Sequence, residues 1–172
     1  MSNANNTYKI YIASDHAGFA LKRFLASELI RDSHDLVDFG ASKLSSEDDY
    51  PDFITPCAER VALARKNGDE RVFGIIIGGS GQGEAMAANR IKGVRAAVFY
   101  GGVTAFRSID IKGDKSRDKM DIVRLARLHN DANVLSLGAR FVSEKDALEV
   151  ARLFISTPFS GEMRHLRRIA KF

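Results

Sequence analysis

The sequence predicts an α/β fold, a Rossmann-like three-layer α/β/α sandwich built around a five-stranded, mostly parallel sheet. Short apolar runs of the kind found in buried strands alternate along the chain with segments of helical spacing. Each strand-like run precedes a helix-like segment, which is the order that parallel strands with right-handed crossovers require. The length of 172 residues and the hydrophobic content of 45% suit one domain, residues 1–172, with a complete core.

The first half of the chain begins with a β-α-β pattern. A strand is expected over residues 9–13, followed by a helix over 21–29, where leucine and phenylalanine recur at helical spacing. A second strand over 36–39 ends at a glycine. A proline at its start and an Asn-Gly pair after its end delimit the next helix, over 51–66. Cys57 shares an apolar face of that helix, so we expect it in the core, with a catalytic role as the alternative.

The second half continues the alternation. Strands are expected over 72–77, 95–99 and 134–137, and helices over 84–91, 121–128, 144–156 and 162–170. Ser143 and Asp146 resemble a capping box at the start of one of these helices. The last segment, 162–172, is a basic helix with four Arg or Lys residues and one Glu.

Composition excludes several classes of function. The single cysteine rules out an intramolecular disulfide and a cysteine-based metal cluster. No segment approaches the roughly 20 apolar residues of a membrane span, and residues 1–7, which we expect to be disordered, lack the features of a secretion signal. We therefore expect a cytoplasmic protein. The net charge of +4 is concentrated near the end of the chain, and this fits a local anion site better than a nucleic-acid-binding face.

The segment 74–84, GIIIGGSGQGE, is the most informative stretch. A strand of buried character runs into a glycine-rich turn that opens a helix. Such a turn points backbone N–H groups at a bound oxygen or phosphate, with the positive end of the helix behind them. Ser80 and Glu84 add a hydroxyl and a carboxylate. A tight turn without a ligand is the alternative.

Two nucleotide-binding motifs do not fit this segment. The Walker A motif needs Gly-Lys-Ser/Thr after its last glycine, but Gly83 is followed by Glu84 and Ala85. The dinucleotide motif G-x-G-x-x-G matches only loosely, and this β-α unit is not the first in the chain. A triphosphate site is therefore not expected.

Polar residues follow other strands of the expected sheet. Asp15 and His16 come after the first strand, and Arg140 comes after the fifth. Ligands bind beyond the carboxyl ends of the strands in parallel sheets, so these positions are candidates for a binding site. His129 and Asn130 lie just before the fifth strand, at the end of a helix.

Four motifs give the chain a specific resemblance. It is similar over nearly its whole length to the ribose-5-phosphate isomerase B and galactose-6-phosphate isomerase family, through SDHAGFALK at 14–22, DYP at 49–51, GGSGQGE at 78–84 with AANR at 87–90, and HNDANVL at 129–135. The resemblance implies a Rossmann-like domain in a homodimer, or a dimer of dimers, with sites at the subunit interface. It also implies interconversion of an aldose phosphate and a ketose phosphate without a metal or cofactor.

The family resemblance assigns the chemistry to the glycine turn. Glu84 is the expected base that removes the C2 proton, at a position where some family members carry a catalytic glutamate; others use a cysteine at the position of Gly78. A surface glutamate favoured by the helix dipole is the alternative. The enediolate oxygens are expected to be held by Ser80 and by the backbone N–H groups of the turn, which includes Gly79, Gly81 and Gly83.

Ring opening and hydroxyl binding involve three further residues. His129 is expected to protonate the ring oxygen from the inward face of its helix, because it follows at helical spacing the apolar residues Ile122, Leu125 and Ala126. A core or helix-end histidine is the alternative. Asn130 is expected to bind a sugar hydroxyl or to cap the helix. Asp15 is expected to bind sugar hydroxyls, to help move a proton, or to act as an N-cap.

The phosphate group requires cations. Arg164 and Arg168 lie four residues apart, so they share one face of the last helix and are expected to clamp a phosphate, as the family's arginines do at this place. The resemblance adds Arg140 and His16 as further phosphate contacts. A solvated basic helix is the alternative.

Residues 100–121 depart from the family pattern as an insertion of near-balanced charge. A lid, a dimer contact or a solvated loop beside the site is expected there. Ribose 5-phosphate, converted to ribulose 5-phosphate, is the first expected substrate. A hexose 6-phosphate such as allose or galactose 6-phosphate, or a non-catalytic sugar-phosphate-binding role, is the alternative.

Overall fold

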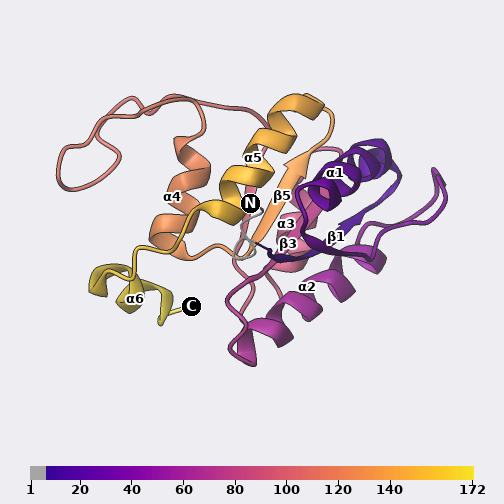
Figure 1. The fold of residues 1–172 in the computed structure, drawn as a ribbon, viewed down its shortest axis with the longest axis horizontal. Helices are drawn as coiled ribbons and strands as arrows, with labels where there is room; N and C mark the ends of the chain where they lie inside the picture. Colours follow the sequence, from indigo (N-terminus) through magenta and orange to yellow (C-terminus); the bar gives the residue numbers. More distant parts are fainter. Residues whose placement is uncertain (1–6) are drawn as a thin grey trace.

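A parallel sheet forms the centre of the computed structural model, which describes residues 7–172 (Figure 1). Its strands are β1 (Lys9–Ser14), β2 (Asp35–Asp38), β3 (Val72–Gly78), β4 (Ala96–Phe99) and β5 (Val134–Gly138), in the order β2-β1-β3-β5-β4. Neighbouring strands all pair in parallel, which confirms the predicted fold class. The expected disorder of residues 1–7 concerns residues that, apart from Thr7, lie outside the described part of the chain.

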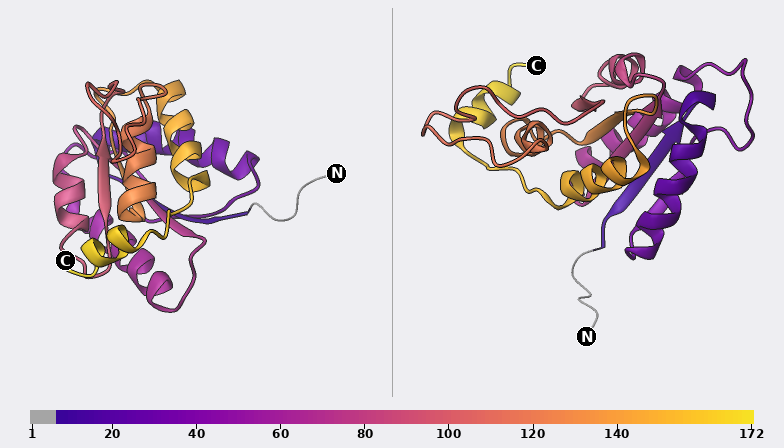
Figure 2. Two further views of the ribbon diagram at one scale, coloured as in Figure 1. Left: turned by 90° about the vertical axis from the view of Figure 1, so that its left-hand side faces the viewer. Right: turned by 90° about the horizontal axis from the view of Figure 1, so that it is seen from above.

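Helices cover both faces of the sheet and give three layers (Figure 2). One face packs against α1 (Phe19–Arg31), α4 (Asp121–Asn130) and α5 (Glu144–Ser156), and the other against α2 (Pro51–Lys66) and α3 (Gln82–Ala88). The last helix, α6 (Met163–Ile169), lies outside these layers beside α4. A short 3-10 helix, η1 (His16–Gly18), connects β1 to α1 and was not predicted. None of the helices in residues 7–172 has the length and apolar character that a membrane crossing requires.

The central strand β3 supplies both cores. All its residues are buried, as expected for a strand with neighbours on both sides and helices on both faces. Ile75 and Ile77 pack with the α1, α4 and α5 side, while Ile76 packs with the α2 side, because successive side chains alternate between faces. On α2, Cys57 is fully buried, which confirms its predicted core position, and burial raises the pKa of its thiol.

The helices that follow β1 and β3 leave toward opposite faces of the sheet. In open parallel sheets such a divergence between neighbouring strands creates a crevice beyond their carboxyl ends, where ligands bind. Gly18 allows the two connections to approach each other closely. A Cβ atom at Gly18 would lie only 2.6 Å from the carbonyl oxygen of Ile77.

A buried lysine fixes the loop that crosses the carboxyl end of β1. Lys22 of α1 is 1% exposed, and its Nζ donates to both carboxylate oxygens of Asp38, at 2.8 and 2.7 Å, and to the Ala41 carbonyl, at 2.9 Å. The Ala41 N–H in turn donates to the Ser14 carbonyl at the end of β1, at 3.3 Å. The segment that follows, residues 42–50, therefore begins from a fixed point beside the crevice.

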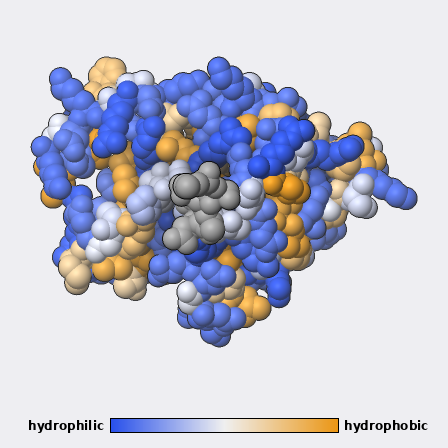
Figure 3. Space-filling model, viewed as in Figure 1, coloured by the Kyte–Doolittle hydropathy of each residue, from blue (hydrophilic) through white to orange (hydrophobic). Residues whose placement is uncertain are grey.

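Residues 100–120 form a long excursion between β4 and α4, at the upper left of Figure 1. Its two ends are joined by a hydrogen bond of 3.0 Å from the Val103 N–H to the Lys119 carbonyl. Asp121 accepts a hydrogen bond of 2.5 Å from the Arg117 N–H. Burial opposes ionisation of Asp121, yet this and further hydrogen bonds lower its carboxyl pKa to about 2. Figure 3 shows mostly hydrophilic residues over this part of the molecule.

The buried face of α4 differs from the prediction. Val123 and Arg127 are 3% and 4% exposed, whereas Ile122 is 48% exposed. The expectation that Ile122 lies on the inward face is therefore wrong, while His129 is half-buried. Met120, at the end of the excursion, is buried, and Val123 instead of Ile122 contacts the core. The buried face is therefore rotated by one residue, about 100° around the helix axis, from the expected face. The expected stripe instead borders the edge strand β4, beside Ala97.

Replacing Gly18 by alanine tests the close approach of the β1 and β3 connections. We expect Gly18→Ala to lower the free energy of unfolding by about 2 kcal/mol or more, because the added methyl meets the Ile77 backbone and the Cγ2 methyl attached close to it. Urea denaturation measures this change. Ala20→Ser, at an exposed position of the next helix, is the matched control and should cost about 0.5 kcal/mol. Equal stability of the two variants would contradict the packing described.

Candidate functional site

A cavity of about 430 Å³ lies beyond the carboxyl ends of β1 and β3, where the chain diverges to the two faces of the sheet. Most residues proposed from the glycine turn and the strand ends line it. The lining residues are Asp15, His16, Ala17, Tyr50, Gly79, Ser80, Gly83, Glu84, Arg140 and Phe141. The cavity thus combines carboxylates, a hydroxyl, an imidazole and a guanidinium group around a glycine-rich backbone.

The Glu84 carboxylate occupies the space that a side chain at Gly78 would fill. An ideal Cβ at Gly78 would lie 1.7 Å from Glu84 Oε1, so the last residue of β3 has to be glycine for this arrangement. Glu84 stands in the first turn of α3 and is only 4% exposed. The expected alternative of a glutamate on the open surface is therefore wrong.

Burial is the main cause of an upward shift in the pKa of Glu84. The nearby charge of Asp15 adds to the shift, while the backbone N–H groups of Glu84 and Gly81 partly offset it by stabilising the carboxylate. A carboxyl group with a raised pKa exchanges a proton more readily near neutral pH than an ordinary glutamate does. The geometry therefore suits Glu84 to a general acid–base role.

Close packing shapes the rest of the glycine turn. Gly81 adopts a φ of +76°, which favours glycine, and its carbonyl accepts a hydrogen bond of 2.6 Å from the Ser136 hydroxyl of β5. A Cβ at Gly83 would lie 2.9 Å from the Tyr50 ring, so the aromatic side chain closes directly over the turn. Ser80 is exposed at the mouth of the cavity, where its Oγ accepts a hydrogen bond of 3.3 Å from the Gln82 N–H.

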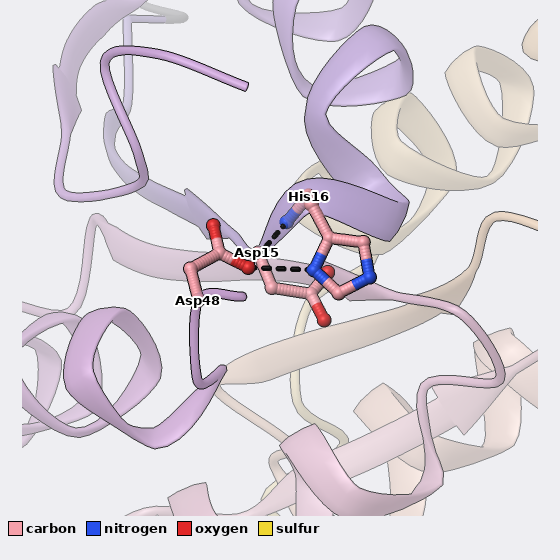
Figure 4. Close-up of side chains that lie close together, drawn as sticks. All are labelled: Asp15, His16 and Asp48. Carbon is pink, nitrogen blue, oxygen red and sulfur yellow. Dashed lines mark hydrogen bonds and ion pairs between the residues drawn. The ribbon is translucent and has the colours of Figure 1, made fainter. Parts of the chain in front are cut away.

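The end of β1 contributes an aspartate and a histidine from one short turn. Asp15 is buried and accepts a hydrogen bond of 3.2 Å from the Gly18 N–H, so it caps η1. The His16 ring lies against Asp48, with 2.6 Å between His16 Nδ1 and Asp48 Oδ1, and the His16 backbone N–H donates to the same oxygen at 3.0 Å (Figure 4). The Asp48 hydrogen bond raises the pKa of His16, although burial opposes the shift.

Arg140 reaches the cavity from the connection after β5. The Arg140 N–H donates to the Gly79 carbonyl at 3.1 Å, and the Ala139 N–H donates to the Gly78 carbonyl at 2.8 Å, so the β5 connection is tied to the glycine turn. The guanidinium carbon lies 3.2 Å from the position of a Cβ at Gly79. This exposed cation stands beside the backbone N–H groups of the turn, an arrangement that suits a bound anion.

The remaining proposed residues form a second group in the protomer. His129, near the end of α4, stacks on His165 of α6 with 4.3 Å between ring centroids. Burial is the main cause of a lowered pKa of His129, and the neighbouring His165 and Arg164 lower this pKa further. Arg164 Nε lies 2.8 Å from the Glu162 carboxylate, and Arg168 is exposed one turn further along α6. These residues form a basic cluster, which we call the α4/α6 cluster.

The topology places the α4/α6 cluster at the opposite edge of the sheet from the cavity. His129 precedes β5, whereas the cavity lies beyond the carboxyl ends of the strands. The length of β5, five residues, corresponds to roughly 16 Å. Asn130 likewise lines a different cavity, of about 650 Å³, beside the start of β4. One protomer therefore does not bring His129, Arg164 and Arg168 to Glu84.

Three residues near the cavity and in the α4/α6 cluster were not predicted from the sequence. Tyr50 belongs to the DYP motif but received no role, although it covers the glycine turn. Asp48 precedes this motif, and only the folded loop shows that it meets His16. His165 is 1% exposed, and its Nδ1 lies 2.7 Å from the Ser160 hydroxyl, behind the ring of His129. His129 and His165 lie on different helices, so no local sequence pattern indicates their contact.

Three side chains beside the cavity, those of Asp15, His16 and Asp48, are of the types that bind cations. Ligand atoms of Asp15, His16 and Asp48 all lie within 4.8 Å of one another. However, His16 Nδ1 already faces Asp48 at hydrogen-bonding distance, and Figure 4 shows the second Asp48 oxygen directed away from the other two residues. Hydrogen bonds between His16 and Asp48 account for the proximity of these two side chains, while Asp15 caps η1.

One known protein family matches nearly the whole chain. The family described as Ribose/Galactose Isomerase matches residues 10–112 and 117–172. These ranges include the cavity residues and the α4/α6 cluster alike. The break between them falls inside the excursion of residues 100–120.

Individual relatives agree with this match. Ribose-5-phosphate isomerase B of Mycolicibacterium paratuberculosis is 35% identical over 161 residues, which cover 94% of this chain and 87% of the relative. The structure of ribose-5-phosphate isomerase B from Mycoplasma genitalium with bound ribulose-5-phosphate matches with a TM-score of 0.77 and 37% identity, covering 95% of this chain and 92% of that chain. Type B ribose 5-phosphate isomerase of Trypanosoma cruzi matches with a TM-score of 0.77 and 36% identity, covering 96% and 94%.

The raised pKa of Glu84 predicts a stability effect that is independent of activity. Between the ordinary pKa of 4.5 and the higher folded-state pKa, the folded protein binds more protons than the unfolded chain, so stability falls as pH rises through this window. At pH 8 the wild type carries the full cost of a buried carboxylate. We expect Glu84→Gln to be more stable than wild type at pH 8, with the difference vanishing as the pH falls below 4.5.

Urea denaturation at several pH values measures this difference. The control is Glu144→Gln, which removes an exposed carboxylate from the first turn of α5 and should slightly destabilise the protein at pH 8, because the helix dipole favours the charge there. A Glu84→Gln variant that is less stable than wild type at pH 8 would contradict the assigned burial effect.

Proposed function

Since the chain belongs to the ribose/galactose isomerase family of sugar-phosphate isomerases, we propose that it interconverts ribose 5-phosphate and ribulose 5-phosphate through an enediolate, without a metal or cofactor. The observation that carries this proposal is the buried Glu84 carboxylate beside a polar cavity. The relatives named above, with their coverage of nearly the whole chain, support the choice of a pentose phosphate.

Glu84 is the proton carrier of the proposed reaction. It removes the proton from C2 of the open-chain aldose and returns it to C1, which moves the carbonyl from C1 to C2. The charge that develops on the oxygens is met by Ser80 and by backbone N–H groups of the glycine turn. Asp15, which lines the same cavity, holds sugar hydroxyls or assists their proton transfer. No step consumes another reactant, because the C2 proton moves to C1, the proton of the C2 hydroxyl moves to the C1 oxygen, and the electron pairs of the double bonds shift with them.

Ring opening and part of the phosphate binding require the α4/α6 cluster of a second copy of the chain. Burial, His165 and Arg164 lower the pKa of His129, so its imidazole is mainly neutral at pH 7 and gives up a proton readily once it is protonated. Arg164 and Arg168 supply charge for the phosphate together with Arg140 and His16. In this dimer, each cavity receives a cluster from the partner, so one assembly holds two sites.

The exposed face of α4 supports the dimer. Ile122 is 48% exposed and borders a groove beside Ala97 and Val98 of the edge strand β4. An apolar helix stripe next to an uncovered strand edge is a surface that a partner would bury. His129 lies on the same stripe and would be carried toward the partner with it.

A hexose 6-phosphate is the second candidate substrate, favoured by one feature. The excursion of residues 100–120 starts at the carboxyl end of β4, and Tyr100 lies beside the Ser80 connection. A longer pocket would accept allose or galactose 6-phosphate. Ketose formation from these sugars and from ribose 5-phosphate, assayed side by side in EDTA, distinguishes the substrates. Loss of turnover in EDTA would contradict the metal-free mechanism, and binding without turnover would favour a non-catalytic subunit.

Removing the carboxylate of Glu84 separates chemistry from binding. We expect Glu84→Gln to lower kcat at least about a thousandfold while sugar-phosphate affinity stays within about tenfold, because the amide keeps the shape but cannot accept the proton. Steady-state kinetics and calorimetric titration measure the two effects. A near-normal rate would remove Glu84 from the mechanism.

Mixing two inactive variants tests the shared site. Glu84→Gln damages the cavity, and Arg168→Ala damages the α4/α6 cluster, chiefly by weakening substrate binding. If each site combines a cavity with the partner's cluster, exchange of subunits at equal amounts makes about half of the dimers mixed, each with one intact site. Activity at low substrate concentration should then rise to about a quarter of wild type. Activity that stays at the average of the two separate variants would place all residues of a site in one protomer.

A further inference from the structure

The contact between Asp48 and His16 has no role in the mechanism above. Asp48 lies on the loop between β2 and α2, 32 residues along the chain from His16. Its Oδ1 accepts two hydrogen bonds, from His16 Nδ1 at 2.6 Å and from the His16 backbone N–H at 3.0 Å. Together the two contacts fix the ring and the backbone of one residue.

The orientation of the His16 ring follows from this pair of contacts. Figure 4 shows the ring nitrogen Nδ1 turned toward Asp48 and the other ring nitrogen, Nε2, on the far side of the ring. His16 lines the cavity, whereas Asp48 does not. Asp48 therefore holds Nδ1 away from the cavity and leaves Nε2 for a ligand.

The environment of Asp48 favours a charged partner. The side chain of Asp48 is 10% exposed, and its Oδ2 is buried without a hydrogen-bond partner among the described residues. A buried carboxylate without other compensation is stabilised by a protonated imidazole in contact with it. The loop cannot easily retreat into solvent, because Lys22 anchors its beginning at Asp38 and Ala41.

Charged residues face His16 from its own segment and from three other parts of the chain. Asp15 precedes it on the β1 side and favours the charged ring, as Asp48 does from the loop before α2, while Arg140 from the β5 connection disfavours it. Glu84 of α3 lines the same cavity. The direct hydrogen bond to Asp48 is the largest influence, and it raises the pKa of His16 against the cost of burial.

We propose that Asp48 is a positioning residue that fixes His16 as a cationic Nε2–H donor facing the phosphate of the substrate. This role rests on the proposed function for the identity of the substrate, but the juxtaposition requires only an anion in the cavity. The His16–Asp48 pair keeps one positive group of the phosphate site at the same place, and the ring retains its proton to higher pH than an ordinary histidine does. Without Asp48, the ring rotates more freely and loses its proton at lower pH.

Proton NMR titration tests the protonation state directly. The chain has four histidines, so their ring signals can be followed one by one, with His16→Gln assigning the signal of His16. In wild type we expect His16 to titrate at higher pH than an ordinary histidine, and in Asp48→Asn at clearly lower pH than in wild type. Glu47→Gln, which removes an exposed carboxylate from the same loop, is the matched control and should leave the titration unchanged.

The pH dependence of KM tests the effect on the substrate. For Asp48→Asn we expect KM for ribose 5-phosphate to rise about tenfold at pH 8 and less than about twofold at pH 6, where the ring regains its proton, with kcat little changed. A merely structural defect would raise KM equally at both pH values and would overturn the proposal. Asp48→Glu, which restores a carboxylate, should recover most of the wild-type KM at pH 8.

A double-variant cycle separates this proposal from the proposed function. Inorganic phosphate is titrated into wild type, Asp48→Asn, His16→Gln and the double variant, in EDTA, with no turnover required. If Asp48 acts through His16, adding Asp48→Asn to His16→Gln changes phosphate affinity no further. Additive effects would overturn the proposal even in an active isomerase. A His16 signal that shifts when Mg²⁺ or Zn²⁺ is added to EDTA-free wild type, and not in Asp48→Asn, would assign Asp15, His16 and Asp48 to a metal and overturn the proposal as well.

Discussion

The structure around the cavity depends on the packing of a carboxylate against a strand end without a side chain. Glu84 occupies the space beside Gly78, where any Cβ would collide with it. The central strand therefore has to end in glycine, and α3 has to begin within a few residues so that its first turn carries the carboxylate back over that strand. Burial and the raised pKa of Glu84 follow from this one fit, as does the position of the backbone N–H groups around it.

Local sequence patterns are sufficient to indicate this part of the site. The strand, the glycine turn and the first helical turn are contiguous, so residues 74–84 predict both the fold of the unit and the place of Glu84. Contacts made by the loop of residues 42–50 were not predictable in this way. Tyr50 reaches the glycine turn and Asp48 reaches His16 because Lys22 and the end of β1 fix that loop, and no periodicity in the sequence indicates such a tertiary contact.

The error on α4 has a different physical origin. An apolar stripe has the same spacing whether it faces the core of its own chain or a partner. Ile122 and His129 gave the pattern of a core face, but the core position belongs to Val123, and Arg127 is buried through bonds to Asp131 and the Ala132 carbonyl. The distance between the α4/α6 cluster and the cavity was missed for the same reason. A sequence pattern carries no information on whether a side chain faces its own copy of the chain or another copy.

The buried thiol of Cys57 can report the separation of α2 from the sheet. The only thiol of the chain lies fully buried between α2 and the sheet, and burial keeps it in the unreactive protonated form. Alkylating reagents therefore reach it only when α2 separates from the sheet. The labelling rate at increasing urea concentration would distinguish local release of this helix from global unfolding, without any introduced probe.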